Sequence, residues 1–257
     1  MTFTLDSNIW ERAVAPQDFQ DDPNYNGFLE LNHFLKSKTD NQFFIHSSIF
    51  DLEAIRRKDR LNTFSGIKPK TTTVQDGNKI SITISIDDSF SIPENPYLTK
   101  RAFEAFNLGI RVTDMPRVGM PRNPIYLEHM CSGDEEQLEL MFEVETYIEN
   151  ELDAGIAALK NKLNSHGLTF TGSLIQDVKT LFNNKVKGFD KVVGEWADGD
   201  SIATHIGMGF DYFVTLDNAA RAGTHSVMYK DNIEKLKSKY KLNKITLEEC
   251  LNLLRRG

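Results

Sequence analysis

The chain has 257 residues, 40% of them hydrophobic, and a formal net charge of −7 at pH 7. This length suits one large domain or two small ones, and the net charge excludes a protein that coats nucleic acid with basic residues throughout. The two cysteines form no CxxC motif, which favours a reducing compartment. The N-terminus does not resemble a signal peptide and no run approaches the roughly 18 apolar residues of a membrane span, so we expect a cytoplasmic protein without a membrane partner.

Two common kinds of site are absent from the sequence. No pair of the six histidines has the i, i+4 spacing of a helical zinc site, and only His129 and Cys131 lie close together as candidate ligands. The glycine-rich motifs GxxxxGK[ST] and GxGxxG, which bind nucleotide phosphates, do not occur. A zinc enzyme or a nucleotide-binding fold of these types is therefore not expected.

The first sixty residues predict alternating strands and helices. Residues 2–5 and 42–48 are short apolar runs typical of buried strands. Residues 24–38 carry apolar side chains at helical spacing, and residues 48–60 do so after a serine that can cap a helix. An order of strand, helix, strand, helix favours an α/β fold with a parallel sheet.

The middle of the chain departs from this alternation. Residues 70–87 contain two Thr- and Ile-rich runs around Asp76-Gly77, which predicts a β-hairpin. Residues 98–107 have a helical pattern, residues 110–114 predict a strand, and a proline-rich loop follows.

Residues 134–165 predict a long helix. Acids open this segment and lysines close it, as the helix dipole favours, and Gly155 is a candidate break. One face of the helix is acidic. That face is either a solvated surface or an arm that meets a protein partner or the second subunit of a homodimer.

The C-terminal part returns to alternating helices and strands. Helical patterns cover residues 171–182, 198–210 and 246–256. Residues 211–217 predict a strand, and residues 225–229 predict a last short strand.

Four acids lie close to predicted strand ends, where open α/β sheets bind their ligands. Asp6 follows the first strand, and Glu53 lies on the helix after the second strand. Asp198 opens the helix that leads into the strand before Asp217. Each acid alone has an ordinary alternative as a helix cap, a turn residue or a surface residue.

Together, the four acids predict a metal site. Carboxylates that converge at one sheet edge repel one another, and a hard cation such as Mg²⁺ or Mn²⁺ relieves that repulsion and prefers oxygen ligands. Such a metal can orient a water and bind a phosphate during its displacement. The natural chemistry of this arrangement is phosphodiester hydrolysis.

Three stretches of the chain resemble the motifs of PIN-domain nucleases. LDSNIW resembles the opening motif, and SSIFDLEAIRR resembles the second motif, with Glu53 as its acid. DGDSIATHIGMGFDYFVTLD resembles the third and fourth motifs together, with Asp198 and Asp217 as their acids. The resemblance covers residues 1 to about 60 and about 170 to 230.

The resemblance implies an α/β fold of the PIN-like type. This is a three-layer sandwich whose central parallel sheet of about 4–5 strands is flanked by helices. A single domain over 1–257 would have its core in about 1–60 and 170–257. Residues from about 62 to 168 would be an insertion that holds the hairpin, a strand and the long acidic helix, although residues 110–114 could still supply a strand of the core.

The resemblance also implies a metal-dependent endoribonuclease, with Asp6, Glu53, Asp198 and Asp217 as its catalytic acids and as ligands of Mg²⁺ or Mn²⁺. Many members of the family are toxins of toxin–antitoxin pairs, and others process or degrade RNA. An RNA substrate is therefore expected, with an antitoxin or another protein as a candidate partner. Asp200 competes with Asp198 for the third position, and the register of the following Ile-Ala pair favours Asp198.

Residues beside these acids have predicted supporting roles. We expect Asn8 to hydrogen-bond a carboxylate or a water, the hydroxyl of Thr215 to support the site, and Ser7 to contribute a backbone N–H. Three arginines that follow the second acid are candidates for binding RNA phosphates: Arg56, Arg57 and Arg60.

Two other functions stay open. A PIN-like chain without catalysis would be a binding or regulatory module that uses its acidic helix and hairpin. A related architecture could also cut structured DNA. Metal binding distinguishes the first alternative from the enzyme, and a comparison of RNA, single-stranded DNA and flapped duplex as substrates distinguishes the second.

Overall fold

The structure is a computed structural model that describes residues 1–37, 40–76, 79–86, 92–117, 122–217 and 223–256. Within these residues, six parallel strands form one sheet in the order β6-β5-β2-β1-β7-β8. The strands are β1 (Thr2–Leu5), β2 (Gln42–His46), β5 (Arg111–Thr113), β6 (Met130–Cys131), β7 (Tyr212–Val214) and β8 (Lys244–Ile245). The predicted α/β class and parallel sheet are confirmed.

The sheet is wider than predicted because a two-residue strand extends each edge. β6 and β8 are too short to give the sequence a strand pattern, so the expected number of about 4–5 strands is too low. The strand predicted over residues 225–229 is wrong, because these residues form turns. Val227 and Met228 are apolar because they are buried beneath a helix, within the hydrophobic cluster on one face of the sheet.

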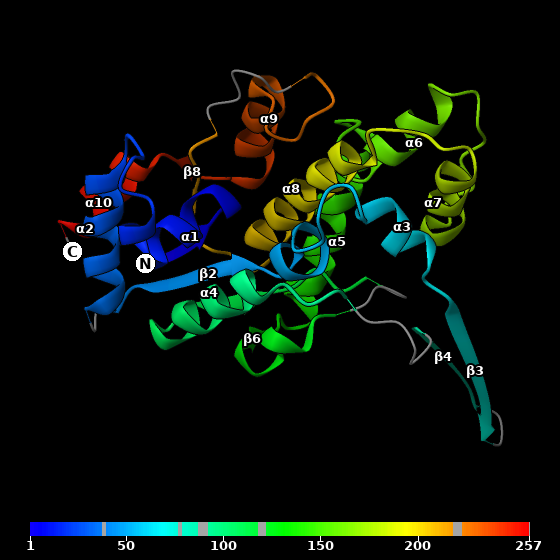
Figure 1. Cartoon of the computed structure of the whole chain (residues 1–257), viewed down its shortest axis with the longest axis horizontal. Coiled ribbons are helices and arrows are strands. Elements are labelled where there is room, and N and C mark those ends of the chain that lie inside the picture. The colour runs from blue at the N-terminus through cyan, green and yellow to red at the C-terminus, as the bar shows by residue number, and fades with distance from the viewer. Residues whose placement is uncertain (38–39, 77–78, 87–91, 118–121, 218–222, 257) are drawn as a thin grey trace.

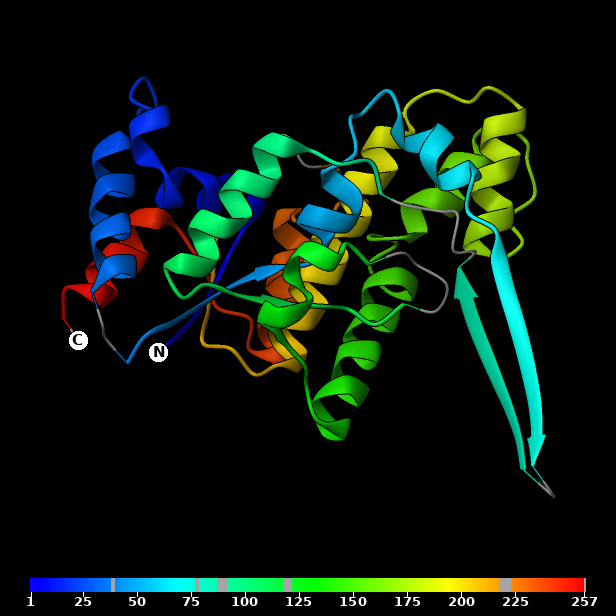
Figure 2. The ribbon, with the colours of Figure 1, turned by 60° about the horizontal axis from the view of Figure 1, so that its bottom comes forward.

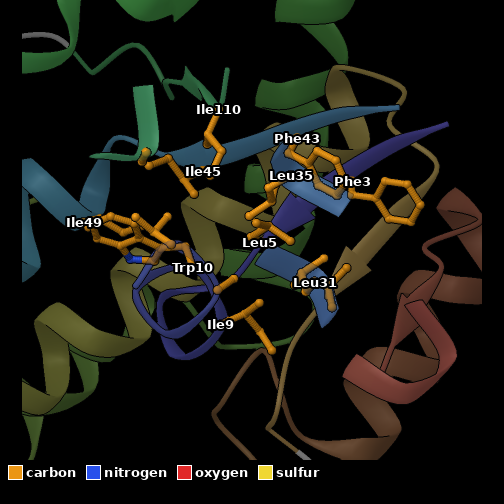
Figure 3. Close-up of a cluster of buried hydrophobic side chains, with 14 of the residues drawn as sticks. Phe3, Leu5, Ile9, Trp10, Leu31, Leu35, Phe43, Ile45, Ile49 and Ile110 are labelled. Carbon is orange, nitrogen blue, oxygen red and sulfur yellow. The ribbon is translucent and has the colours of Figure 1, made fainter. Parts of the chain in front are cut away.

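One face of the sheet packs against helices at the left of Figure 1. These helices are α1 (Ser7–Val14), α2 (Tyr25–Lys36), α4 (Pro96–Asn107) and α10 (Leu247–Leu254). Phe3 and Leu5 alternate with Thr4 along β1 and point into this layer, since successive strand residues face opposite sides. Figure 3 shows them with apolar side chains of β2, α1 and α2, namely Phe43, Ile45, Ile9, Trp10, Leu31 and Leu35.

The other face of the sheet packs against α5 (Glu135–Asn150), α8 (Phe189–Gly207) and α9 (Lys230–Tyr240). The Thr4 hydroxyl lies 2.8 Å from Nδ1 of His205, which joins β1 to α8 on this side. Burial lowers the pKa of His205 to about 3, so its ring is neutral at physiological pH. The arrangement is a three-layer sandwich with helices on both faces of a parallel sheet.

A second, smaller core lies beyond the sheet. The N-terminal half of α8 packs there against α3 (Arg60–Ser65), α6 (Ala157–Asn164) and α7 (Leu174–Asn183). Figure 1 shows α8 as a long helix that passes from the sheet into this group. The middle of α8 therefore lies between the two cores.

Two predicted helices begin or end elsewhere. α8 begins at Phe189, so Asp198 lies in the middle of the helix and does not open it, contrary to the prediction. The helix predicted over residues 48–60 is a single π-helical turn (Ile49–Glu53), followed by a turn and by α3. Such π-helical turns are rare and often lie at functional sites.

Residues 62–168 contribute to the sheet as well as to a projection from it. The predicted hairpin is confirmed as β3 (Pro69–Asp76) and β4 (Lys79–Ile86), although Gly77 of its turn lies outside the described residues. Figures 1 and 2 show the hairpin extending away from the rest of the molecule. The same part of the chain supplies β5, β6 and α5, so it does not lie wholly outside the core.

The helical segment predicted over residues 134–165 is confirmed in two parts, and the chain breaks at the predicted candidate, Gly155. The chain forms α5 and α6 with a break between them, where Asp153 and Gly155 adopt φ values of 50° and 63°. Two short 3₁₀ helices complete the secondary structure of the described residues, at Pro16–Asp18 and Pro124–His129. Among the residues that the structure describes, no helix is both long and apolar enough to cross a membrane.

Candidate metal centre at the carboxyl edge of the sheet

Asp6 lies at the junction between β1 and α1, and hydrogen bonds fix its position. Its backbone N–H donates to the carbonyl of Val214 at 3.0 Å, and its carbonyl accepts the N–H of Ile9 at 2.9 Å. Asp6 is the N-cap of α1, and its carboxylate accepts the N–H of the first helical residue, Ser7, at 2.7 Å. Asp6 is therefore a helix cap and a buried acid at the strand end at the same time.

Asn8 and Thr215 orient the carboxylate of Asp6 from two different elements. Asn8 Nδ2 donates to Asp6 Oδ2 at 2.8 Å, and the Thr215 hydroxyl donates to the same oxygen at 2.5 Å. Asn8 Oδ1 accepts the N–H of Leu216 at 2.9 Å, and Thr215 Oγ1 accepts the N–H of Asp217 at 2.9 Å. The start of α1 is thereby tied to the chain that follows β7.

Glu53 ends the π-helical turn after β2 and lines the same small pocket as Asp6. Burial raises the pKa of Glu53 to about 7, and the negative charge of Asp6 adds to this effect. The Ser7 side chain hydrogen-bonds Glu53 and opposes the shift. Glu53 is thus an acid that titrates near neutral pH in the absence of a cation.

Asp198 reaches this pocket from the middle of α8. Burial raises the pKa of Asp198 well above its ordinary value, and the charges of Asp6, Glu53, Glu195 and Asp217 raise it further. Burial also raises the pKa of Asp6, with a contribution from Asp217. The structure therefore brings carboxylates from β1, the π-helical turn and α8 close enough to repel one another.

Asp217 and Glu195 interact with this group through their charges. Asp217 is exposed and comes after the end of β7. Glu195, one helical turn before Asp198 on α8, was not predicted from the sequence. Burial raises the pKa of Glu195, and Asp217 adds to the shift. The Glu-x-x-Asp spacing could have identified Glu195, because residues three apart share a helix face once α8 is known to begin at Phe189.

His46 was also missed. It ends β2, lines the pocket with Asp6 and is buried. Its Nδ1 lies 2.8 Å from the Ser48 hydroxyl, and its Nε2 lies 3.2 Å from the Thr204 hydroxyl. Burial lowers the pKa of His46 to about 4, so the ring carries no charge at neutral pH. Its position at the carboxyl end of a predicted strand is the sequence feature that could have identified His46.

Asp200, the competitor of Asp198, forms a buried ion pair instead. Arg117 donates to its two oxygens, from Nε at 2.9 Å and from Nη2 at 2.5 Å. The same guanidinium pairs with Glu145 of α5. Asp198, and not Asp200, lines the pocket that contains Asp6 and Glu53.

The three arginines predicted to bind phosphates lie in different environments. Arg56 and Arg57 are exposed, so solvent and ligands can reach them. Arg60 is buried and donates to three backbone carbonyls, those of Ile55, Glu53 and Asp190. Arg60 therefore holds the π-helical turn and α8 together, which differs from the phosphate-binding role predicted for it.

The donor set suits a hard divalent cation. Carboxylate oxygens of Asp6, Glu53 and Asp198 line one pocket, and the charge of Asp217 adds to the raised pKa of Asp198, so a cation there would relieve their mutual repulsion. As the side chains stand, no three His, Cys, Asp or Glu residues of the described part of the chain are placed to hold one ion. No protein-family model matches the chain, and no curated protein matches it.

Proposed function

We propose that the protein is a Mg²⁺- or Mn²⁺-dependent endoribonuclease whose active site comprises Asp6, Glu53, Asp198 and Asp217. The observation that supports this most is the raised pKa of Asp198, which arises from burial and from the charges of carboxylates on other elements. Buried like charges are costly, and proteins tolerate them mainly at functional sites. The location at the carboxyl edge of a parallel sheet adds support.

The proposed reaction is hydrolysis of a phosphodiester. A water oxygen bonds to phosphorus, one bridging P–O bond breaks, the water gives up one proton, and the leaving oxygen takes one up. A bound Mg²⁺ or Mn²⁺ would supply Lewis-acid polarisation of a phosphate oxygen and make a nearby water more acidic. Asp6, fixed by its hydrogen bonds, would position the reacting groups, and the ionised carboxylate of Glu53 would help to hold the ion.

A cleavage assay tests the proposal. Wild-type protein should cut single-stranded RNA in Mn²⁺ and not in chelator. Asp6→Asn and Asp198→Asn should lower the rate by roughly 100-fold or more, because each removes a charge that the cation needs. Asp21→Asn is the control, since Asp21 is exposed and outside the pocket. No cleavage by the wild type with any divalent metal, or normal cleavage by both variants, would show that the proposal is wrong.

One observation favours a second candidate, a binding or regulatory module that keeps the fold without catalysis. In the described residues, the acids are not placed to hold one ion as they stand. A cation that binds only the native state raises the free energy of unfolding by about 2.7 kcal/mol at one hundred times its Kd. A Tm that does not change in millimolar Mn²⁺ would therefore favour the module, and a rise that Asp198→Asn abolishes would favour the enzyme.

A further inference from the structure

A pocket lined by lysines opens directly beside the candidate metal centre. It lies between α9, β8 and the start of α10, and it shares Thr215 and Asp217 with the site. Its volume is about 420 Å³, within the range of about 300–1,000 Å³ typical of ligand pockets. We call it the lysine pocket after Lys230, Lys237 and Lys244, which line it.

The lysine pocket has an apolar floor, and its rim carries three lysines together with three acids, Asp217, Glu234 and Glu249. Met228 and Ile233 are buried in its wall, and Ile245 lines it from β8. Lys230 and Lys237 are exposed, as residues that can reach a ligand must be. This combination suits a phosphorylated sugar, whose C–H face can rest on the apolar floor while its phosphates meet the lysines.

Two acids of the lysine pocket are already engaged. Glu249 Oε2 accepts the N–H of Thr246 at 2.8 Å and its hydroxyl at 2.9 Å, in the capping box of α10. Glu234 pairs with Lys237 at 3.0 Å, and both side chains are largely exposed. An exposed pair of this kind contributes little, so a phosphate can replace the carboxylate as the partner of Lys237.

Lys244 connects the lysine pocket to the acids. Its Nζ donates to the backbone carbonyl of Asp217 at 2.5 Å. Burial lowers the pKa of Lys244, whereas the charges of Asp217 and Asp6 raise it, so its ammonium group interacts with both acids. An ammonium has three donors, and a phosphate next to the scissile one would lie within reach of those that remain.

We infer that the lysine pocket binds the sugar-phosphate backbone of single-stranded RNA on one side of the scissile phosphate. This inference rests on the proposed function, because it takes the acids as the place of cleavage. Lysines that contact phosphates position a strand without reading its sequence, and they make its affinity depend on salt. The pocket would therefore set where the strand lies and not which base is cut.

Binding measured without cleavage tests the inference. The probe is a fluorescently labelled single-stranded RNA of twelve nucleotides, titrated in chelator over a series of salt concentrations and followed by anisotropy. Lys230→Gln, Lys237→Gln and Lys244→Gln should each reduce the slope of log K against log salt by about 0.7 and weaken binding roughly fivefold at 0.1 M salt. Lys235→Gln is the matched control, because Lys235 is exposed on the same helix but is not among the described residues that line the pocket.

The outcomes separate this inference from the proposed function. Weaker binding by the three pocket variants, with Lys235→Gln unchanged, supports it even if no RNA is ever cut. Equal binding by wild type and pocket variants overturns it, and so does an equal loss in Lys235→Gln, which would indicate a diffuse charge effect. RNA cleavage that is normal in all three pocket variants, with unchanged KM, would overturn the inference and leave the proposed function intact. Lys230 and Lys237 are exposed, so their variants are expected to fold.

Discussion

Thr215 links two of the proposed metal ligands through one hydroxyl group. Its Oγ1 donates to Asp6 and accepts the N–H of Asp217, so it fixes an acid on β1 relative to the chain after β7. Groups that orient metal ligands typically change activity about 10–100-fold when removed. Thr215→Val keeps the shape and removes the hydroxyl, and Thr215→Ser keeps the hydroxyl.

We therefore expect Thr215→Val to lower kcat/KM for RNA about 10–100-fold, and Thr215→Ser to retain most of the activity. Steady-state cleavage in saturating Mn²⁺ measures both. Since Thr215 is buried, a loss of folding is a competing explanation that circular dichroism would detect. Equal activity of the two variants would show that the Thr215 hydroxyl does not contribute to catalysis.

Arg60 gives a prediction about stability rather than substrate binding. Its guanidinium is buried and serves three backbone carbonyls. Arg60→Ala should lower the free energy of unfolding by about 2–4 kcal/mol, because it leaves buried acceptors without donors. Arg57→Ala, on an exposed neighbour, should change stability by less than about 0.5 kcal/mol. Urea denaturation compares the two, and a stable Arg60→Ala that binds RNA weakly would instead favour the role predicted from the sequence.

At the residue scale, local pattern identifies Asp6, which follows a strand directly, whereas Asp198 in the interior of α8 was predicted only through the family resemblance, and Glu195 on the same helix was missed. Asp6 follows an apolar run directly, so its place can be predicted from local pattern. Glu195 lies in the interior of α8, where no strand end marks it. The partner of Asp200 could not be predicted either, because Arg117 lies 83 residues away in the chain.

α8 packs closely against α5 and against the break that follows it. A Cβ at Gly207 would lie 2.8 Å from the backbone N of Met141, and a Cβ at Gly199 would lie 2.9 Å from the Cα of Gly155. Such contacts are with backbone atoms that cannot move aside. The two glycines therefore allow α8 to approach its neighbours and so place Asp198 at the sheet edge.

This approach predicts opposite effects for two Gly-to-Ala changes on the same helix. Gly207→Ala should destabilise the protein by about 1–3 kcal/mol through overpacking. Gly194→Ala should stabilise it by about 0.5–1 kcal/mol, because, apart from its chain neighbours and the nearby backbone of α8, no described atom lies within 4 Å of the added Cβ and alanine is the better helix former. Thermal unfolding of both variants checks the pair, and similar shifts in both would contradict the packing described.

Helix boundaries were the weakest sequence predictions, for reasons that α8 illustrates. Gly194 and Gly199 lower the helix propensity of the segment before Ile202, so the pattern alone suggests a later start. Packing against α3, α6 and α7 overrides that propensity. In contrast, β1 and the β3–β4 hairpin follow from local signals and were placed correctly.

At the scale of the whole molecule, burial of the acids and the repulsion among them link stability to pH and to metal. The folded protein keeps a proton on Glu53 up to a pKa of about 7, whereas the unfolded chain releases it near 4.5. The folded state thus binds more protons between these values, and this contribution to stability falls as pH rises through that window. Above pH 7, ionisation of Glu53 lowers the free energy of unfolding by about 3 kcal/mol.

Glu53→Gln should therefore be more stable than the wild type at pH 8 in chelator, with a smaller difference at pH 5. Mn²⁺ should reduce the difference at pH 8, because a cation stabilises the ionised carboxylate. Comparing the two proteins isolates Glu53 from His46, whose lowered pKa has the opposite effect on stability. Urea unfolding at both pH values measures the difference, and a wild type that is more stable than Glu53→Gln at pH 8 without metal would contradict the raised pKa of Glu53.

The central claim is that acids from β1, the π-helical turn, α8 and the end of β7 bind one or two divalent cations. The most direct measurement is anomalous diffraction from crystals soaked in Mn²⁺. The account predicts a manganese peak bonded to carboxylate oxygens of Asp6 and Asp198, with Glu53 or Asp217 completing the protein ligands. Crystals without manganese in that pocket, or with manganese only beside Glu145, Glu149 and Asp200, would contradict it.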